Sequence, residues 1–249
     1  ESKKYIPNSS LIYKLIGELQ NMRAGNNDWM QAREFQAETY GYDKYLGGCH
    51  MIPNHAIIIL SLLFGDDDLQ KTLMIVNTAG HDTDCNSGNV GCIMGIKNGL
   101  EGLRNGPDYL TPIQDRMYCP TANGGETQTD ALTEAYKVIN TAKRMNKEEI
   151  VEPKNGSRFH FEMPGSVQGW RSSFKNNKNI STIVQNTEYE SSIGKRALEI
   201  KFDRVAPGVC SEAVVDTFFP QELYELTGSA RERFFQSYNF ISCPLLYSG

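Results

Sequence analysis

The stretch Ala79–Gly88 reads AGHDTDCNSG and stands between a strongly apolar run and a segment with regularly spaced glycines. Its Asp82 and Asp84 are one residue apart, so an extended or turning backbone can direct both carboxylates to one point. Hard cations take oxygen ligands of this kind. The same aspartates can instead cap the helix that follows, because Asp is a preferred N-cap residue. The sequence therefore leaves two interpretations open: a cation site, or helix caps. The free N–H groups of a helix start also suit a phosphate or a metal-bound water.

The segment after this stretch is predicted to be a helix over about 86–98. Its glycines at 88, 91, 95 and 99 follow one another at steps of three, four and four, so they share one helix face. Each glycine costs a helix about 1 kcal/mol. Close packing of this face against a neighbouring backbone would explain that cost, and leucine at Gly91 or Gly95 is then expected to destabilise the fold. Cys92 is expected to be a small buried hydrophobe.

The apolar run 57–64 predicts a buried core helix that begins at Asn54. Gly65 is interpreted as its C-cap, and the three following aspartates as N-cap and first-turn residues of a helix over 69–77. Two amphipathic helices precede this pair, one after Ser10 that ends near Gly25 and one from Asp28 to about residue 40. Neither of these two is expected to carry chemistry on its face. The loop over 42–53 is a candidate pocket wall. His50 and His55 are interpreted as caps or half-buried side chains, with contact to a ligand as the alternative.

A further helix is predicted around residues 132–145, with an apolar stripe interpreted as core. Charged residues and Pro153 then indicate a boundary near residue 150. Beyond it the apolar period changes from 3.6 to 2, clearest over 196–203. Further short strands are predicted over 159–162, 182–184, 213–216 and 234–241. Several short strands of this kind indicate a β-sandwich. Trp170 is interpreted as core, with stacking on a sugar as the alternative.

The run 77–86, NTAGHDTDCN, with Gly91 and Gly95 after it, resembles the C-terminal signature of the ADP-ribosylglycohydrolase family. The run 54–65 resembles the helix that precedes this signature, and the resemblance covers about residues 5–145. It implies a Mg²⁺ centre held by Asp82, Asp84 and the position of Cys85, where the family has a hydroxyl residue. A thiol is a poor ligand for magnesium. The third contact is therefore expected to be lost or to pass through water.

The resemblance also implies an activity. The expected function is a magnesium-dependent hydrolase that cleaves an N- or O-glycosidic bond to ADP-ribose or a related glycosyl group, with Asp82 and Asp84 as catalytic residues. Its substrate is then a ribosyl or glycosyl small molecule or an ADP-ribosylated protein. The predicted substrate-binding residues are Gly80, His81, Asn86, Asn54 and His50. The alternative is a non-catalytic binding or scaffold protein that has kept the fold. Cys85 as a nucleophile is a further alternative, since helix N-termini lower thiol pKa values.

The family's N-terminal Gly-Asp motif is not found in this sequence. The chain is therefore expected to hold the later part of the helical domain, without its N-terminal half, and to be weakly active or inactive alone. The predicted fold class is multidomain: a partial all-α ADP-ribosylglycohydrolase-like domain over 1–149, then a partial all-β jelly-roll or sandwich module over 157–249. The second module has a diffuse similarity, at 165–170 and 194–198, to modules of carbohydrate-active enzymes.

Composition excludes several classes of partner. The 249 residues carry a net charge of −5, and the lack of a basic cluster argues against nucleic-acid binding. No apolar run reaches the roughly 18 residues of a membrane-spanning helix. Six scattered cysteines without a C-x-x-C pair favour free thiols. A cytoplasmic location is therefore expected.

Overall fold

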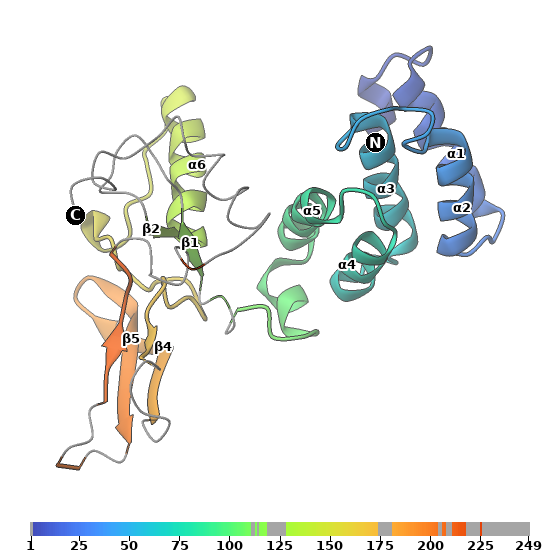
Figure 1. Cartoon of the computed structure of the whole chain (residues 1–249). Coiled ribbons are helices and arrows are strands. Elements are labelled where there is room, and N and C mark those ends of the chain that lie inside the picture. Colours follow the sequence, from blue (N-terminus) through green and yellow to red (C-terminus); the bar gives the residue numbers. More distant parts are fainter. Residues whose placement is uncertain are drawn as a thin grey trace. The chain divides into compact units, whose positions relative to one another are not determined.

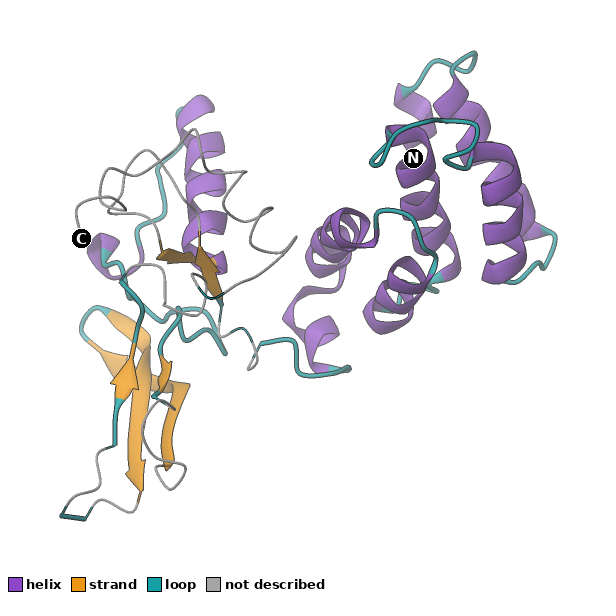
Figure 2. Cartoon of the chain, in the orientation of Figure 1, coloured by secondary structure: helices purple, strands orange, loops and turns teal. Residues whose placement is uncertain are grey.

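The computed structural model describes residues 2–110, 113, 115–118, 128–173, 181–203, 206–207, 211–217 and 225. The chain divides into two compact units, Glu1–Asp108 and Tyr109–Gly249. The first unit is helical, and the strands belong to the second (Figures 1 and 2). The division falls before the boundary near residue 150, so the domain limits 1–149 and 157–249 stay a prediction. Among the described residues, no helix is long and apolar enough to cross a membrane.

Five α-helices build the first unit after a short 3-10 turn at Ser2–Tyr5: α1 (Leu11–Ala24), α2 (Trp29–Tyr40), α3 (Met51–Phe64), α4 (Leu69–Thr78) and α5 (Thr83–Arg104). All five confirm helices predicted from the sequence. α3 begins three residues before the predicted Asn54, because the His50 side chain caps it: its Nδ1 accepts a hydrogen bond from the backbone N–H of Ile52 at 3.2 Å. α5 continues past the predicted Asn98.

α3 is the central helix of this unit and contacts each of the other four. Its residues are apolar almost all round, which is typical of a helix buried on every side. Leu60 and Phe64 pack in one cluster with residues of α1 and α2, while Ile57 packs in a second cluster with residues of α4 and α5. Since burial of a Leu or Ile side chain contributes about 1.5–3 kcal/mol, α3 stabilises both halves of the unit.

The acidic segment between α3 and α4 has a structural role. Gly65 is the C-cap of α3, and the Asp68 carboxylate caps α4 by accepting from the backbone N–H of Lys71 at 2.6 Å. Asp66 forms ion pairs with Arg23 and Lys71. These contacts confirm Gly65 and Asp68 as caps. Asp66 and Asp67 lie in the turn before the cap, with φ of 52° and 60°, so their assignment to the first turn of α4 is wrong.

The glycine face of α5 does not pack as predicted. A methyl group added at Gly88, Gly95 or Gly99 would meet no described atom within 4 Å, and one at Gly91 would meet only the Leu73 side chain at 4.0 Å. The close-packing prediction is therefore wrong for the described residues, and so is the burial of Cys92, which is exposed. The reason is the orientation of α5, which packs on α3 and α4 through other residues such as Val90 and Met94. At Gly99 a φ of 62° interrupts the helix.

Substitution of Gly95 by Ala is expected to raise the free energy of unfolding by about 1 kcal/mol. Alanine lowers the backbone entropy of the unfolded chain, and its methyl group meets no described atom in the folded protein. Gly65→Ala is the matched control: its new methyl group would lie 1.9 Å from Thr72 Oγ1 and 2.9 Å from the Ser61 carbonyl oxygen. That variant is expected to lose about 1–3 kcal/mol. Urea denaturation measures both changes. A loss of stability in Gly95→Ala would show that the glycine face is covered in the folded protein.

The described part of the second unit contains one α-helix, α6 (Ala131–Met145), a 3-10 turn at Pro153–Gly156, and six strands. The strands are β1 (Arg116–Tyr118), β2 (Gln128–Asp130), β3 (Arg171–Ser172), β4 (Ser181–Ser191), β5 (Gly194–Asp203) and β6 (Ala213–Val214). They form three two-stranded antiparallel sheets: β1 with β2, β3 with β6, and β4 with β5. The described residues do not form a complete jelly roll.

Two predictions for this unit are wrong. Residues 159–162 are irregular rather than a strand, with Phe161 in the left-handed region at φ 57°. The apolar stripe of α6 is core only at its start: Leu132 is buried, whereas Ile139 and Met145 are exposed. Periodicity placed these residues on one face, but among the described elements α6 contacts chiefly β2, the strand that directly precedes it. The strand predicted over 234–241 lies outside the described residues.

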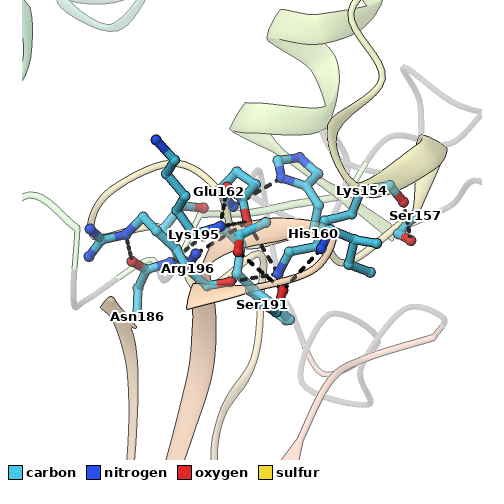
Figure 3. Close-up of polar contacts among 12 residues, drawn as sticks. Lys154, Ser157, His160, Glu162, Asn186, Ser191, Lys195 and Arg196 are labelled. Atoms are coloured by element: carbon cyan, nitrogen blue, oxygen red, sulfur yellow. Dashed lines mark hydrogen bonds and ion pairs between the residues drawn. The ribbon is translucent and has the colours of Figure 1, made fainter. Parts of the chain in front are cut away.

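Glu162 links the irregular segment 159–162 to the β4–β5 hairpin by hydrogen bonds (Figure 3). Its carboxylate accepts hydrogen bonds from the backbone N–H groups of Lys195, at 3.1 Å, and Arg196, at 3.3 Å, and forms an ion pair with Lys154 at 3.2 Å. A side chain at Gly194 would clash with this carboxylate, at 2.2 Å. The irregular segment 159–162 is thus held by a side chain rather than by strand pairing.

The hydrogen bond from the Lys195 backbone is the main cause that lowers the pKa of Glu162 below its ordinary value. Because the folded-state pKa is depressed, the stability that this group contributes is present above about pH 4.3 and is lost as the pH falls through the folded pKa. Glu162→Gln is expected to remove this component, so that the variant loses less stability on acidification. Urea denaturation across the acidic range measures it, with Glu190→Gln on β4 as control. Parallel pH profiles for wild type and Glu162→Gln would contradict the assignment.

Candidate metal centre

A sharp reversal of the chain joins α4 to α5 and positions the acidic pair. Gly80 and His81 both have left-handed backbone angles, with φ of 81° and 63°. Glycine adopts this region freely, whereas for His81 it is a less common conformation that the surroundings must hold. Two contacts do so: Arg33 Nε donates to the Ala79 carbonyl oxygen, and the His81 ring meets the Tyr42 ring edge-on with centroids 4.3 Å apart. We call residues 79–86 the acidic corner.

Asp82 occupies the N-cap position of α5, but its side chain makes no capping hydrogen bond. Its Oδ2 instead accepts a hydrogen bond from Asn54 Nδ2 on α3, at 2.8 Å. The Tyr42 hydroxyl donates to Asn54 Oδ1, which fixes the orientation of that amide. The capping interpretation is therefore wrong for Asp82. Its carboxylate is held toward α3 by a chain of two hydrogen bonds.

Asp84 and Cys85 follow in the first turn of α5 and complete a small cluster. One potential ligand atom from each of Asp82, Asp84 and Cys85 lies within 4.8 Å of the other two. Two ligands of a single ion, bonded at about 2.1–2.5 Å, lie at most about 5 Å apart, so one ion can reach all three. Asp82 is half-buried, whereas Asp84 and Cys85 are exposed. The helix dipole at this first turn also favours a carboxylate.

The thiol and the carboxylate in this cluster influence each other's protonation. A hydrogen bond from the Cys85 thiol is the main cause that lowers the pKa of Asp82, with the Asp84 side chain second. The same hydrogen bond raises the pKa of Cys85 above its ordinary value. Cys85 therefore stays protonated at neutral pH, which opposes its interpretation as a nucleophile, because the thiolate is the reactive form.

The neighbouring aromatic residues are held in defined protonation states. Burial, with the charge of Arg33 as a second cause, lowers the pKa of His81, so its imidazole is neutral at pH 7. Burial and the charge of Asp82 raise the pKa of Tyr42, so its hydroxyl keeps the proton that it donates to Asn54.

Sequence reasoning missed three residues of the acidic corner's surroundings. Tyr42 lies in the loop predicted as a pocket wall, but nothing singled out its hydroxyl. Cys49, in the same loop, also donates a hydrogen bond to Asp82. Arg33 lies on α2, a helix expected to carry no chemistry, and that expectation is corrected by its bond to Ala79. No local pattern reports a contact between residues 46 positions apart.

The predicted substrate-binding residues fall into three groups. Gly80, His81 and Asn54 lie at or against the acidic corner. Asn86 is only 1% exposed, and its Nδ2 has no hydrogen-bond partner among the described residues. The described side-chain contacts of His50 are its cap on α3 and a tilted ring contact with Tyr45, at 5.4 Å. Contacts of these five predicted residues with a substrate stay predictions.

The donor set fits a divalent cation in part. Two carboxylates supply hard oxygen atoms and two negative charges, which suits Mg²⁺. The protonated thiol of Cys85 does not suit it. Asp82 and Asp84 are thus the residues that would hold the ion.

The central helix of this helical unit holds the Asp82 carboxylate beside Asp84, at a corner that one divalent cation can reach. These features define the class as a helical protein with a candidate metal centre. The family model described as ADP-ribosylglycohydrolase matches residues 4–145, more than half of the chain. The chain therefore belongs to the ADP-ribosylglycohydrolase family, which confirms the resemblance and supports a hydrolase of that type. No curated protein matches the chain, and no solved structure does.

Proposed function

We propose that the acidic corner is the metal centre of a magnesium-dependent hydrolase that cleaves an N- or O-glycosidic bond to ADP-ribose or a related ribosyl or glycosyl group. The substrate is a ribosyl or glycosyl small molecule or an ADP-ribosylated protein. One observation carries the proposal for a chain of this family. The Asp82 carboxylate makes no capping hydrogen bond and is held by Asn54 beside Asp84.

Residues in and around the acidic corner have separate roles in this proposal. Asp82 and Asp84 hold the ion. Asn54 orients the Asp82 carboxylate, and Tyr42 orients Asn54 by donating to its amide oxygen, so that the amide nitrogen faces Asp82. The ion, when bound, orients ribose hydroxyls and activates water for attack at the anomeric carbon. The neutral His81 imidazole, at the turn before Asp82, is assigned to the substrate side together with Gly80.

Residues 157–249, the later part of the second unit, are proposed to form a sandwich module of the carbohydrate-binding type. Support comes from the long antiparallel β4–β5 pair, in register from Thr182 opposite Phe202 to Glu188 opposite Arg196. Along β5, apolar residues alternate with charged ones, as in a strand with one packed face.

The test of the proposed activity is release of ADP-ribose from ADP-ribosylated arginine and serine by the purified protein. Release is expected with millimolar Mg²⁺ and is expected to stop when EDTA removes the ion. Release that is unaffected by EDTA would contradict a metal-dependent mechanism. Absence of release from a folded, magnesium-loaded protein would contradict this substrate class.

A further inference from the structure

A second candidate binding site lies in the second unit, between α6 and the segment 151–160. It is a cavity of about 240 Å³, and the lining residues used below are Tyr136, Asn140, Arg144, Ser157, Arg158 and His160. We call it the α6 pocket. One of its walls lies beyond residue 145, where the family match ends.

The two walls of the α6 pocket are fixed to each other. The Asn140 side chain on α6 forms two hydrogen bonds with the backbone of Val151: its Nδ2 donates to the carbonyl oxygen at 2.9 Å, and its Oδ1 accepts from the N–H at 2.8 Å. Further along, the Ser157 hydroxyl donates to the Lys154 carbonyl oxygen at 2.8 Å and closes the turn. The pocket is therefore a feature of the fold rather than a gap beside a loose segment.

A buried histidine presents a donor of fixed orientation among the lining residues. His160 is 4% exposed, and its Nδ1 accepts a hydrogen bond from the Glu162 backbone N–H at 3.1 Å (Figure 3). The proton of the neutral ring is therefore on Nε2. The ring packs edge-on against Tyr136, with centroids 5.4 Å apart. The carboxylate of Glu162 accepts hydrogen bonds from the β4–β5 hairpin. Because Glu162 is held in place, its backbone N–H also fixes the orientation of the His160 ring.

Two guanidinium groups give the α6 pocket an excess of positive charge. Among the described residues, neither Arg144 nor Arg158 is in a salt bridge; Arg158 donates to the neutral carbonyl and amide oxygens of Gln128, both at 3.2 Å. Lys137, also at the pocket, is paired with Glu134 at 3.0 Å. Glu152 is the acidic residue of the lining. This local excess stands out in a chain with a net charge of −5.

We propose that the α6 pocket binds a small phosphorylated molecule of about the size of a sugar phosphate. Guanidinium groups match phosphate geometry with paired N–H donors, and charge-assisted hydrogen bonds of this kind are the strong ones. The His160 N–H supplies a neutral donor beside them. The volume is below the roughly 300–1,000 Å³ of pockets for larger ligands, which favours a monosaccharide-sized molecule over a dinucleotide.

The experiment is a calorimetric titration of the whole chain with ribose 5-phosphate, compared with ribose and inorganic phosphate. Ribose 5-phosphate is expected to bind most tightly. Arg144 is exposed, so its substitution does not disturb the core. Arg144→Gln is expected to weaken binding by about tenfold. Lys143→Gln is the matched control, because it removes the same charge from the adjacent residue, which pairs with Glu148 and does not line the pocket. It is expected to change the affinity less than twofold.

Four results would overturn the proposal. Absence of binding heat at about 5 mM ribose 5-phosphate would show that the chain has no specific site for it. Equal losses in Arg144→Gln and Lys143→Gln would show attraction to diffuse surface charge instead of a site. Equal affinities for inorganic phosphate and ribose 5-phosphate would overturn the assignment of a sugar-sized ligand. A shift of the His160 ring resonances on titration would place the ligand in the pocket, and unshifted resonances would place it elsewhere.

Discussion

Asp84→Ala is expected to abolish magnesium-dependent release of ADP-ribose while the protein stays folded. The substitution removes one of the two carboxylates that hold the ion, and the ion's effect on the transition state is worth several kcal/mol. A loss of that size corresponds to at least about 100-fold in rate. Asp84 is exposed and lies in the first turn of α5, so the loss of its favourable dipole interaction costs at most about 1 kcal/mol of stability.

Asp68→Ala is the matched control, since it makes the same chemical change at another helix start of the same unit. Asp68 caps α4 with a hydrogen bond to the Lys71 N–H, and its loss is expected to cost about 1 kcal/mol of stability without reducing turnover. The two variants should therefore show opposite patterns. Unchanged turnover in Asp84→Ala would remove the acidic corner from the active site. A folded wild-type protein without turnover would favour the non-catalytic binding protein.

Local sequence rules predicted most of the helical unit. Ser10, Asp28 and Asp68 each cap a helix through a side-chain bond to a backbone N–H three residues later, so their information lies within one turn. The apolar run of α3 identified the central helix for a similar reason, because a helix without a polar face has to be covered on all sides.

What lies against a helix face could not be predicted in this way. Periodicity correctly placed the α5 glycines on one side, but the buried side is the one that carries Val90 and Met94. The stripe of α6 failed for the same reason: spacing predicts which residues share a face, whereas burial depends on distant segments. The Tyr42–Asn54–Asp82 chain is likewise non-local, with partners 12 and 28 residues apart. It removes the Asp82 side chain from the capping role, where the sequence left a cap and a cation site open.

Cys85→Thr is expected to increase the affinity of the acidic corner for Mg²⁺. The wild-type thiol is a soft ligand that stays protonated and donates to Asp82. A threonine hydroxyl keeps a proton to donate and offers a hard oxygen, which magnesium prefers. The expected change is a fall in Kd of about tenfold, or about 1.4 kcal/mol, from a wild-type value near the millimolar range.

Calorimetry with MgCl₂ after removal of bound metal measures this change, and Cys92→Thr is the control because it makes the same exchange at an exposed position further along α5. Cys92→Thr is expected to leave magnesium binding unaltered. If Cys85→Thr also leaves it unaltered, the third residue of the cluster does not contact the ion, and Asp82 and Asp84 hold it with water alone. If the wild type already binds magnesium at micromolar concentrations, the thiol does not limit affinity, because a complete oxygen shell must then be present around the ion.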